Sequence, residues 1–223
     1  MEGDAAHHVG RVLRAQVGQL YELSDGQKVW LGQISRVARD RVEFALVEEL
    51  PAYRPAVDVT LLLAVVKFDA FEWAIEKATE LGVGAIVPLA AERSEGALTA
   101  AAAKRTERWK KILAEASQQS RRVNVPSLET LTRPEPCFAQ NKAGLRLVLS
   151  ERQDARPLRE VLEGQKPSKA VMAIGPEGGW TDKELESADH SGFKQVSLGK
   201  LILRTETAVI AALASLKYAL GAE

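Results

Sequence analysis

Two glycine-containing turns near the C-terminal end of the chain constrain its fold most strongly. Residues 175–179 read Gly-Pro-Glu-Gly-Gly and follow the apolar run 170–174. Residues 197–200 read Ser-Leu-Gly-Lys and end a second short apolar run. Each turn is followed by a segment with helical periodicity. Because open parallel sheets bind ligands outside the carboxyl ends of their strands, we expect the two turns to form one ligand site at such an edge.

The region from residue 57 onward alternates between short apolar runs and amphipathic segments. Continuous apolar runs of this length are typical of strands that are buried on both faces. The alternation predicts a parallel α/β domain. The predicted strands are 59–66, 85–89, 145–149, 170–174 and 196–198.

The predicted helices of this region carry their apolar residues on one stripe. Capping boxes are expected where Asp69 precedes Glu72 and where Thr181 precedes Glu184, with Trp180 placed for a hydrophobic staple. Further helices are expected at 104–121 and 158–162, and a final one after Thr205 carries Val209, Leu213, Leu216 and Leu220 on one stripe. That stripe fits either the domain core or a dimer contact.

The first part of the chain has a different pattern. Short stretches that alternate or are rich in strand formers occur at 9–17, 19–23, 28–34 and 41–47. Asp25-Gly26 is typical of a tight hairpin, which requires positive φ. Closely spaced short strands predict a small β-barrel. The prolines at 51 and 55 place the domain boundary there, which gives domains 1–54 and 55–223.

Composition excludes several classes of protein. Hydrophobic residues make up 46% and charged residues 27% of the chain, which is typical of globular proteins, and no apolar run reaches the roughly 20 residues of a membrane span. The acidic N-terminus does not resemble a signal peptide. Cys137 is the single cysteine, so no internal disulfide forms, and a reducing cytoplasm is expected. We interpret Cys137 as a partly buried small residue rather than a nucleophile.

The formal net charge is zero, so no overall field attracts nucleic acid. Residues 104–122 are locally basic, with seven Lys or Arg against two Glu, a local charge of +5. This run is either a solvated helix face or an RNA contact. Three histidines and one cysteine offer no ligand spacing, so no metal site is expected.

The glycine turn at 175–179 lacks the features of a phosphate loop. It continues as Trp180-Thr181 rather than Lys-Ser/Thr, and the dinucleotide pattern Gly-x-Gly-x-x-Gly is missing. The turn therefore suits a ligand without a polyphosphate, because glycines let backbone groups approach a flat uncharged ring such as adenine. Alone, it could also be a tight strand-to-helix turn that binds nothing.

The two turns and the following Leu-Arg-Thr-Glu-Thr-Ala at 203–208 together resemble the knotted SPOUT class of S-adenosylmethionine-dependent RNA methyltransferases. Within that class the chain resembles the bacterial 16S rRNA uridine N3-methyltransferase family. Lys200 stands where the family commonly has proline, which puts the shape of the second turn in question. Further matching segments are 7–14, 76–83, 88–89, 92–94, 108–109 and 116–121.

The resemblance implies a trefoil-knotted C-terminal domain that holds the adenosine of S-adenosylmethionine in the knot, and an N-terminal PUA-like RNA-binding barrel. It also implies a homodimer with active sites at the subunit interface, acting on 16S rRNA, in the small ribosomal subunit. The expected cofactor-binding residues are Ile174, Gly175, Gly179, Leu198, Gly199, Ile202 and Leu203.

Methyl transfer to a uracil N3 requires alignment and removal of the imide proton. Arg204 is the expected partner of the uracil oxygens or of a phosphate, because a guanidinium donates two parallel hydrogen bonds. The alternative is an ion pair of Arg204 with Glu177 or Glu206 that only holds the turn. Glu177 and Glu206 are the candidates for orienting groups or proton acceptors.

Arg11 and Arg14 are the expected RNA contacts of the barrel, unless they merely flank a strand. Two other functions remain open. One is a different SPOUT activity, such as methylation of a ribose 2′-hydroxyl or of a tRNA base. The other is a non-catalytic RNA-binding protein that assists ribosome assembly.

Overall fold

The computed structural model describes residues 1–52 and 55–221, and the chain divides into two compact units, Met1–Arg54 and Pro55–Glu223. Each unit is described by itself. Among the described residues, no helix has both the length and the apolar character needed to cross a bilayer.

The N-terminal unit contains an antiparallel sheet, formed by β1 (Leu20–Ser24), β2 (Val29–Val37) and β3 (Val42–Leu50) in that order. The expected hairpin turn joins β1 to β2. Asp25 Oδ1 accepts hydrogen bonds from the backbone N–H groups of Gln27 (2.8 Å) and Lys28 (2.7 Å), and Gly26 adopts φ +89°.

The predicted strand at 9–17 is wrong. Residues Gly3–His7 form the short helix α1 and His8–Val12 form the π-helix η1. The physical reason is the burial of Ala6 and Val9, three residues apart on one helical face, against Ile34 and Val42 of the sheet. The spacing of Ala6 and Val9 matches the period of a helix, whereas the weak alternation of residues 9–17 had suggested a strand.

Seven strands among residues 55–221 form one sheet in which every pairing is parallel, in the order β6-β5-β4-β9-β7-β10-β8. Together with the antiparallel N-terminal sheet, this confirms the predicted fold class. The strands are β4 (Asp58–Ala64), β5 (Ala85–Leu89), β6 (Ser127–Leu128), β7 (Leu145–Leu149), β8 (Arg156–Pro157), β9 (Lys169–Ile174) and β10 (Lys194–Ser197).

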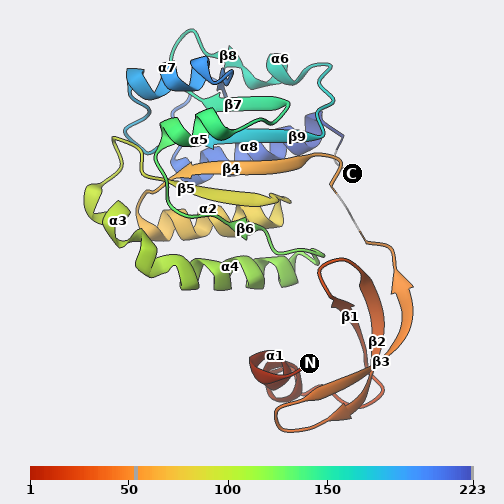
Figure 1. Ribbon diagram of the computed structural model, residues 1–223. Coiled ribbons are helices and arrows are strands. Elements are labelled where there is room, and N and C mark those ends of the chain that lie inside the picture. Colours follow the sequence, from red (N-terminus) through yellow and green to blue (C-terminus); the bar gives the residue numbers. More distant parts are fainter. Residues whose placement is uncertain (53–54, 222–223) are drawn as a thin grey trace. The chain divides into compact units, whose positions relative to one another are not determined.

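Helices cover both faces of this sheet. In Figure 1, α5 lies in front of the sheet and α8 lies behind it. Alternate residues of β4 enter the two cores: Leu61 and Leu63 pack in one, and Leu62 and Ala64 in the other. The helices are α2 (Phe68–Glu80), α3 (Gly96–Ala101), α4 (Thr106–Gln119), α5 (Pro134–Gln140), α6 (Leu158–Leu162), α7 (Asp182–His190) and α8 (Thr205–Ala219), with the 3₁₀ turn η2 (Ala102–Arg105) before α4.

One of the two expected capping boxes is present. At α7 the Thr181 hydroxyl accepts from the Glu184 N–H (3.3 Å), and the Glu184 carboxylate accepts from the Thr181 N–H (2.8 Å). The box predicted at Asp69 and Glu72 is wrong, because α2 begins after Lys67 without a side-chain cap.

Glu72 pairs instead with the basic segment. Its buried carboxylate accepts from Arg108 Nε at 2.7 Å and lies 3.5 Å from Arg105 Nη1. Arg122 donates to the Thr79 carbonyl at 2.6 Å, and burial lowers the pKa of Arg122. Glu72 thus sets one negative charge against the local +5, and Arg122 is hydrogen-bonded within the chain.

The apolar stripe of α8 belongs largely to the core. Val209, Leu213 and Leu216 are buried in the cluster that also contains Phe71 and Ile75 of α2. Tyr218, by contrast, is 92% exposed. The core interpretation therefore holds for the buried part of the stripe, and any contact with a second chain would have to use other residues of α8.

Candidate functional site

A large pocket lies at the carboxyl ends of β7, β9 and β10. Its volume is about 1740 Å³, and residues from α6 and α8 complete its wall. Three loops contribute to it: 149–155 after β7, 174–180 after β9 and 197–203 after β10. The three strands are neighbours in the sheet, with β7 between β9 and β10. The parallel register therefore brings the two glycine turns to one edge, as the sequence predicted.

The first glycine turn is fixed by the indole of Trp180. A Cβ atom at Gly175 would lie 3.0 Å from Trp180 Cε2, which is tighter than most Cβ contacts, so a side chain there would require the indole or the turn to shift. Trp180 Nε1 donates to the Leu149 carbonyl at 2.9 Å, which ties the turn to the end of β7. Gly179 has φ +69°, and its N–H donates to the Pro176 carbonyl at 2.8 Å. The backbone of this turn is therefore held on both sides.

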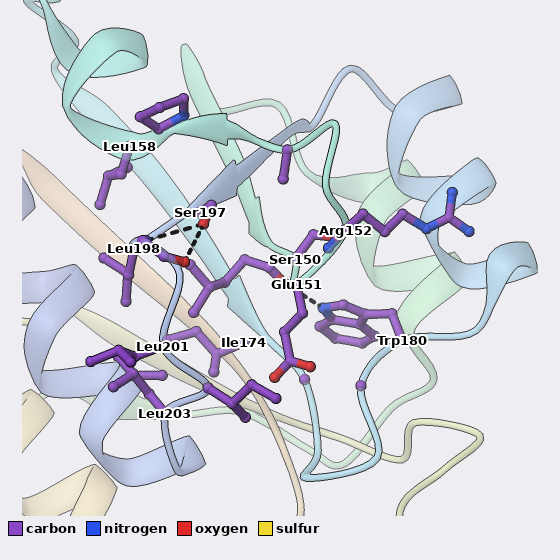
Figure 2. A pocket seen from close by; sticks show the side chains of 18 of the residues that line it. Ser150, Glu151, Arg152, Leu158, Ile174, Trp180, Ser197, Leu198, Leu201 and Leu203 are labelled. Atoms are coloured by element: carbon purple, nitrogen blue, oxygen red, sulfur yellow. Dashed lines mark hydrogen bonds between the residues drawn. The ribbon is translucent and has the colours of Figure 1, made fainter.

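The second turn is closed by Ser197, as the dashed lines in Figure 2 show. The Ser197 hydroxyl accepts from the Gly199 N–H at 3.1 Å and donates to the Gly199 carbonyl at 3.0 Å. Gly199 has φ +122°, a conformation that side chains disfavour. Since these contacts precede Lys200, the turn closes without the proline that the family commonly has there.

The pocket has an apolar side and a polar centre. Figure 2 shows Ile174, Leu201 and Leu203 on one side, Trp180 on the other, and the Glu151 side chain extending between them. Leu198 and Leu203 are partly buried against the core, whereas Leu201 and Ile202 are 84% and 81% exposed. Apolar side chains, backbone groups of two turns and a carboxylate together suit a ligand with a flat uncharged ring and a positive charge.

The pocket brings together all seven expected cofactor-binding residues, and Glu177 as well. Glu177 is exposed at the pocket lining. Residues 174, 175, 179, 198, 199, 202 and 203 all line it.

Arg204 and Glu206 are not among the lining residues. Arg204 is exposed at the N-cap of α8, and Glu206 is half-buried in the first turn of that helix. Within residues 1–52 and 55–221, no ion pair joins Arg204 to Glu177 or Glu206. The turn-holding alternative for Arg204 therefore has no contact to support it.

Arg11 and Arg14 belong to the N-terminal unit. Arg11 is exposed in η1, and Arg14 is exposed just after it with φ +51°. Because residues 8–12 are helical and the first strand begins only at Leu20, the two arginines do not flank a strand.

Several charged pocket residues were missed from the sequence, among them Glu151, Arg152 and Arg93. Glu151 and Arg152 directly follow β7, and Arg152 pairs with Asp182 of α7. Arg93 follows β5 and donates to two carbonyls of the first glycine turn. Glu151 and Arg152 could have been found, because they come directly after a correctly predicted strand, where parallel sheets place their ligand sites.

The remaining chemical candidates lie elsewhere. Cys137 is in α5 and does not line the pocket, and burial raises the pKa of its thiol to about 11. A neutral thiol is a poor nucleophile, so the structural interpretation of Cys137 is supported. In the part of the chain that the structure describes, no cluster of three His, Cys, Asp or Glu side chains could hold a metal ion.

Comparison with known proteins gives matches over both units. Residues 53–217 match an RNA methyltransferase domain, and residues 2–47 match an RNA methyltransferase PUA domain. Ribosomal RNA small subunit methyltransferase E of Synechocystis sp. is 37% identical over 220 residues, which cover 94% of this chain and 69% of the relative. The protein of the same name from Aquifex aeolicus is 32% identical over 94% of this chain and 89% of its own length.

A solved structure is similar in both sequence and fold. The crystal structure of ribosomal RNA small subunit methyltransferase E from Neisseria gonorrhoeae, bound to S-adenosyl methionine, has a TM-score of 0.88 and 31% identity. The match covers 98% of this chain and 90% of that one. The pocket with its two glycine turns fits the RNA methyltransferase class that both domain matches name. The chain belongs to the ribosomal RNA small subunit methyltransferase E family of RNA methyltransferases.

Proposed function

We propose that this protein transfers a methyl group from S-adenosylmethionine to N3 of a uridine in 16S rRNA. The observation that carries the proposal is the convergence of both glycine turns on one pocket. Family membership supports the rRNA methyltransferase class, and the Neisseria relative was solved with S-adenosyl methionine bound. The choice of uridine N3 rests on the sequence motifs.

The residues present fit the adenosine part of this cofactor. Ile174, Leu198 and Leu203 offer apolar surface for adenine, and the backbone of the turns at 175–179 and 197–200 offers hydrogen bonds to its edge. Glu151 extends into the same space and suits a hydroxyl or a positive group. A carboxylate also stabilises a nearby sulfonium charge.

When bound, the cofactor supplies an activated methyl group on a positively charged sulfur. The protein then has to align that methyl with the uracil and help to remove the N3 proton. Alignment of two reactants can supply several kcal/mol, up to about 7 to 11 kcal/mol in well-oriented systems. The two closed turns suit this role, because hydrogen bonds and glycine contacts already fix their backbone.

Arg204 is the proposed partner of the uracil oxygens. Its guanidinium is exposed directly after the pocket-lining Leu203, and no carboxylate among the described residues neutralises it. We place the proton acceptor at Glu177, because it lines the pocket and is exposed. Glu206 then has an orienting role in the first turn of α8, where a negative charge is favoured by the helix dipole.

The working form is proposed to be a homodimer in the cytoplasm. Leu201, Ile202 and Tyr218 line the pocket and are 84%, 81% and 92% exposed. Large apolar side chains this exposed in one place are typical of interaction sites, and a second copy of the chain would cover them beside the substrate. The N-terminal PUA-like unit would bind RNA through Arg11 and Arg14, which are exposed on and after η1.

The proposal is tested by transfer of labelled methyl from S-adenosylmethionine to small ribosomal subunits from a strain that lacks this protein. Naked 16S rRNA from the same strain shows whether the assembled subunit is required. The expected product is a single uridine methylated at N3. A methylated ribose, or label in tRNA instead, would point to a different SPOUT activity. Absence of both label and cofactor binding would favour a non-catalytic assembly factor.

A further inference from the structure

The loop after β5 contacts the first glycine turn through one arginine. Arg93 Nη1 donates to the carbonyl of Gly178 at 2.9 Å and to the carbonyl of Trp180 at 3.3 Å. The two carbonyls flank Gly179, which has φ +69°. One guanidinium therefore holds the peptide group just before the left-handed Gly179 and the peptide group just after Trp180.

The Arg93 side chain packs closely against the turn at Gly178. A Cβ atom at Gly178 would lie 3.3 Å from Arg93 Cβ and 3.5 Å from Arg93 Cδ. The arginine stem thus packs directly on the backbone of the turn. A side chain at Gly178 would therefore press on Arg93 and loosen this packing.

The loop that carries Arg93 is itself held by a buried carboxylate. Glu184 is 1% exposed and accepts from the backbone N–H of Glu92 at 2.9 Å. The same carboxylate accepts from the Thr181 N–H at 2.8 Å and from the Thr181 hydroxyl at 2.9 Å. Glu184 therefore joins the residue before Arg93 to the residue after Trp180, so both ends of the Arg93 contact have one common anchor.

We propose that Arg93 is a positioning residue of the cofactor site and that Glu184 holds Arg93 in register with the glycine turn. This inference rests on the proposed function, since it assumes that the turn binds S-adenosylmethionine. A turn whose carbonyls are already fixed loses less conformational freedom when the cofactor binds, so affinity rises. Arg93 is exposed, so its removal should change cofactor affinity more than global stability.

The first test compares Arg93→Ala, Arg93→Lys and wild type, with Arg133→Ala as the matched control at an exposed arginine outside the pocket lining. Calorimetric titration gives Kd for S-adenosylmethionine, and steady-state kinetics give KM and kcat. For Arg93→Ala we expect Kd and KM to rise about tenfold, since a charged hydrogen bond is lost, with kcat at saturation unchanged. Arg93→Lys should recover part of the affinity, and Arg133→Ala should match wild type.

Hydrogen exchange of free protein provides a readout that does not depend on activity. Amides of residues 175–181 should exchange faster in Arg93→Ala than in wild type, at an unchanged thermal midpoint. Equal Kd and equal exchange in the two proteins would overturn the inference. A fall in kcat at unchanged Kd would also overturn it, because Arg93 would then act on the reacting groups. If wild type itself binds no cofactor, it is the proposed function that fails.

The role of Glu184 is tested by Glu184→Gln, alone and combined with Arg93→Ala. The amide keeps the size of the side chain but presents an NH₂ group to N–H donors, so the link to Glu92 or Thr181 weakens. If both residues act through the same turn, the double variant should lose no more affinity than Arg93→Ala alone. Additive losses would show that Glu184 does not act through Arg93. If Glu184→Gln does not fold, the hydrogen exchange of Arg93→Ala still decides the positioning role.

Discussion

Trp180 and Gly175 are in direct contact across the first glycine turn. The indole lies so close to the Gly175 backbone that an added Cβ would be 3.0 to 3.2 Å from three of its ring atoms. Gly175→Ala should therefore displace the indole or the turn. We expect the affinity for S-adenosylmethionine to fall about tenfold or more, from a strain of one to several kcal/mol. Calorimetric titration with S-adenosylmethionine measures this affinity.

Gly144→Ala is the matched control for this prediction. A Cβ at Gly144 would meet only the Lys169 carbonyl at an ordinary 3.8 Å. This variant should bind cofactor like wild type. Full affinity in Gly175→Ala would show that the Trp180 contact does not shape the site.

The hydrogen bond of Trp180 should contribute to stability as well. Trp180→Phe keeps an aromatic ring but leaves the Leu149 carbonyl without the donor that lies 2.9 Å away. Because Trp180 is only 7% exposed, water replaces this bond poorly. We expect the free energy of unfolding to fall by about 1 to 2 kcal/mol in urea denaturation. Trp73→Phe, at a 44% exposed site, should change it much less.

Arg204 should be needed for chemistry but not for folding. It is exposed at the N-cap of α8 and makes no side-chain cap hydrogen bond. For Arg204→Ala we expect kcat for methyl transfer to fall by about 10² or more, as when one donor to a developing negative charge is removed. Thermal midpoint and cofactor Kd should stay near wild type. Turnover at the wild-type rate would remove Arg204 from the mechanism.

The ionisation of the Cys137 thiol should affect stability only at alkaline pH. Its ordinary thiol pKa of 9.0 is raised to about 11 by burial. Between these values the unfolded chain releases the thiol proton and the folded chain retains it, so this contribution to stability is complete below pH 9 and is lost toward pH 11. The decline of unfolding free energy over this range should be shallower in Cys137→Ala. An identical decline in both proteins would contradict the assigned pKa.

The elements that lie in the core of the sheet domain could be predicted closely from the sequence. The strand 145–149, the strand 85–89 and the helix 158–162 were predicted with their observed bounds, because burial imposes a clear apolar pattern. Two-residue strands such as β6 and β8 were missed, since they carry too few residues to show any period. The helical start of the chain was mistaken for a strand, because only two of its apolar residues enter a core.

The glycine turns of the site could be predicted from the sequence, because their backbone conformation favours glycine. The charged side chains that reach the site from distant segments could not be predicted, because only the tertiary structure brings them there. Gly175 and Gly199 mark their turns in the sequence. Arg93 reaches the first turn from a loop more than eighty positions earlier, and a register of parallel strands brings it there. Glu72 is a second example. Its place in the sequence predicted a helix cap, whereas its carboxylate pairs with the distant segment around Arg108.

The central claim is that the two glycine turns together bind the adenosine of S-adenosylmethionine. Calorimetric titration of wild type and of a Gly175→Ala/Gly199→Val variant tests it most directly, because Gly199 needs φ +122° and Gly175 contacts Trp180. The account predicts binding of the cofactor to wild type and no measurable heat for the folded double variant. Absence of heat with wild type, or equal affinity in both proteins, would contradict it.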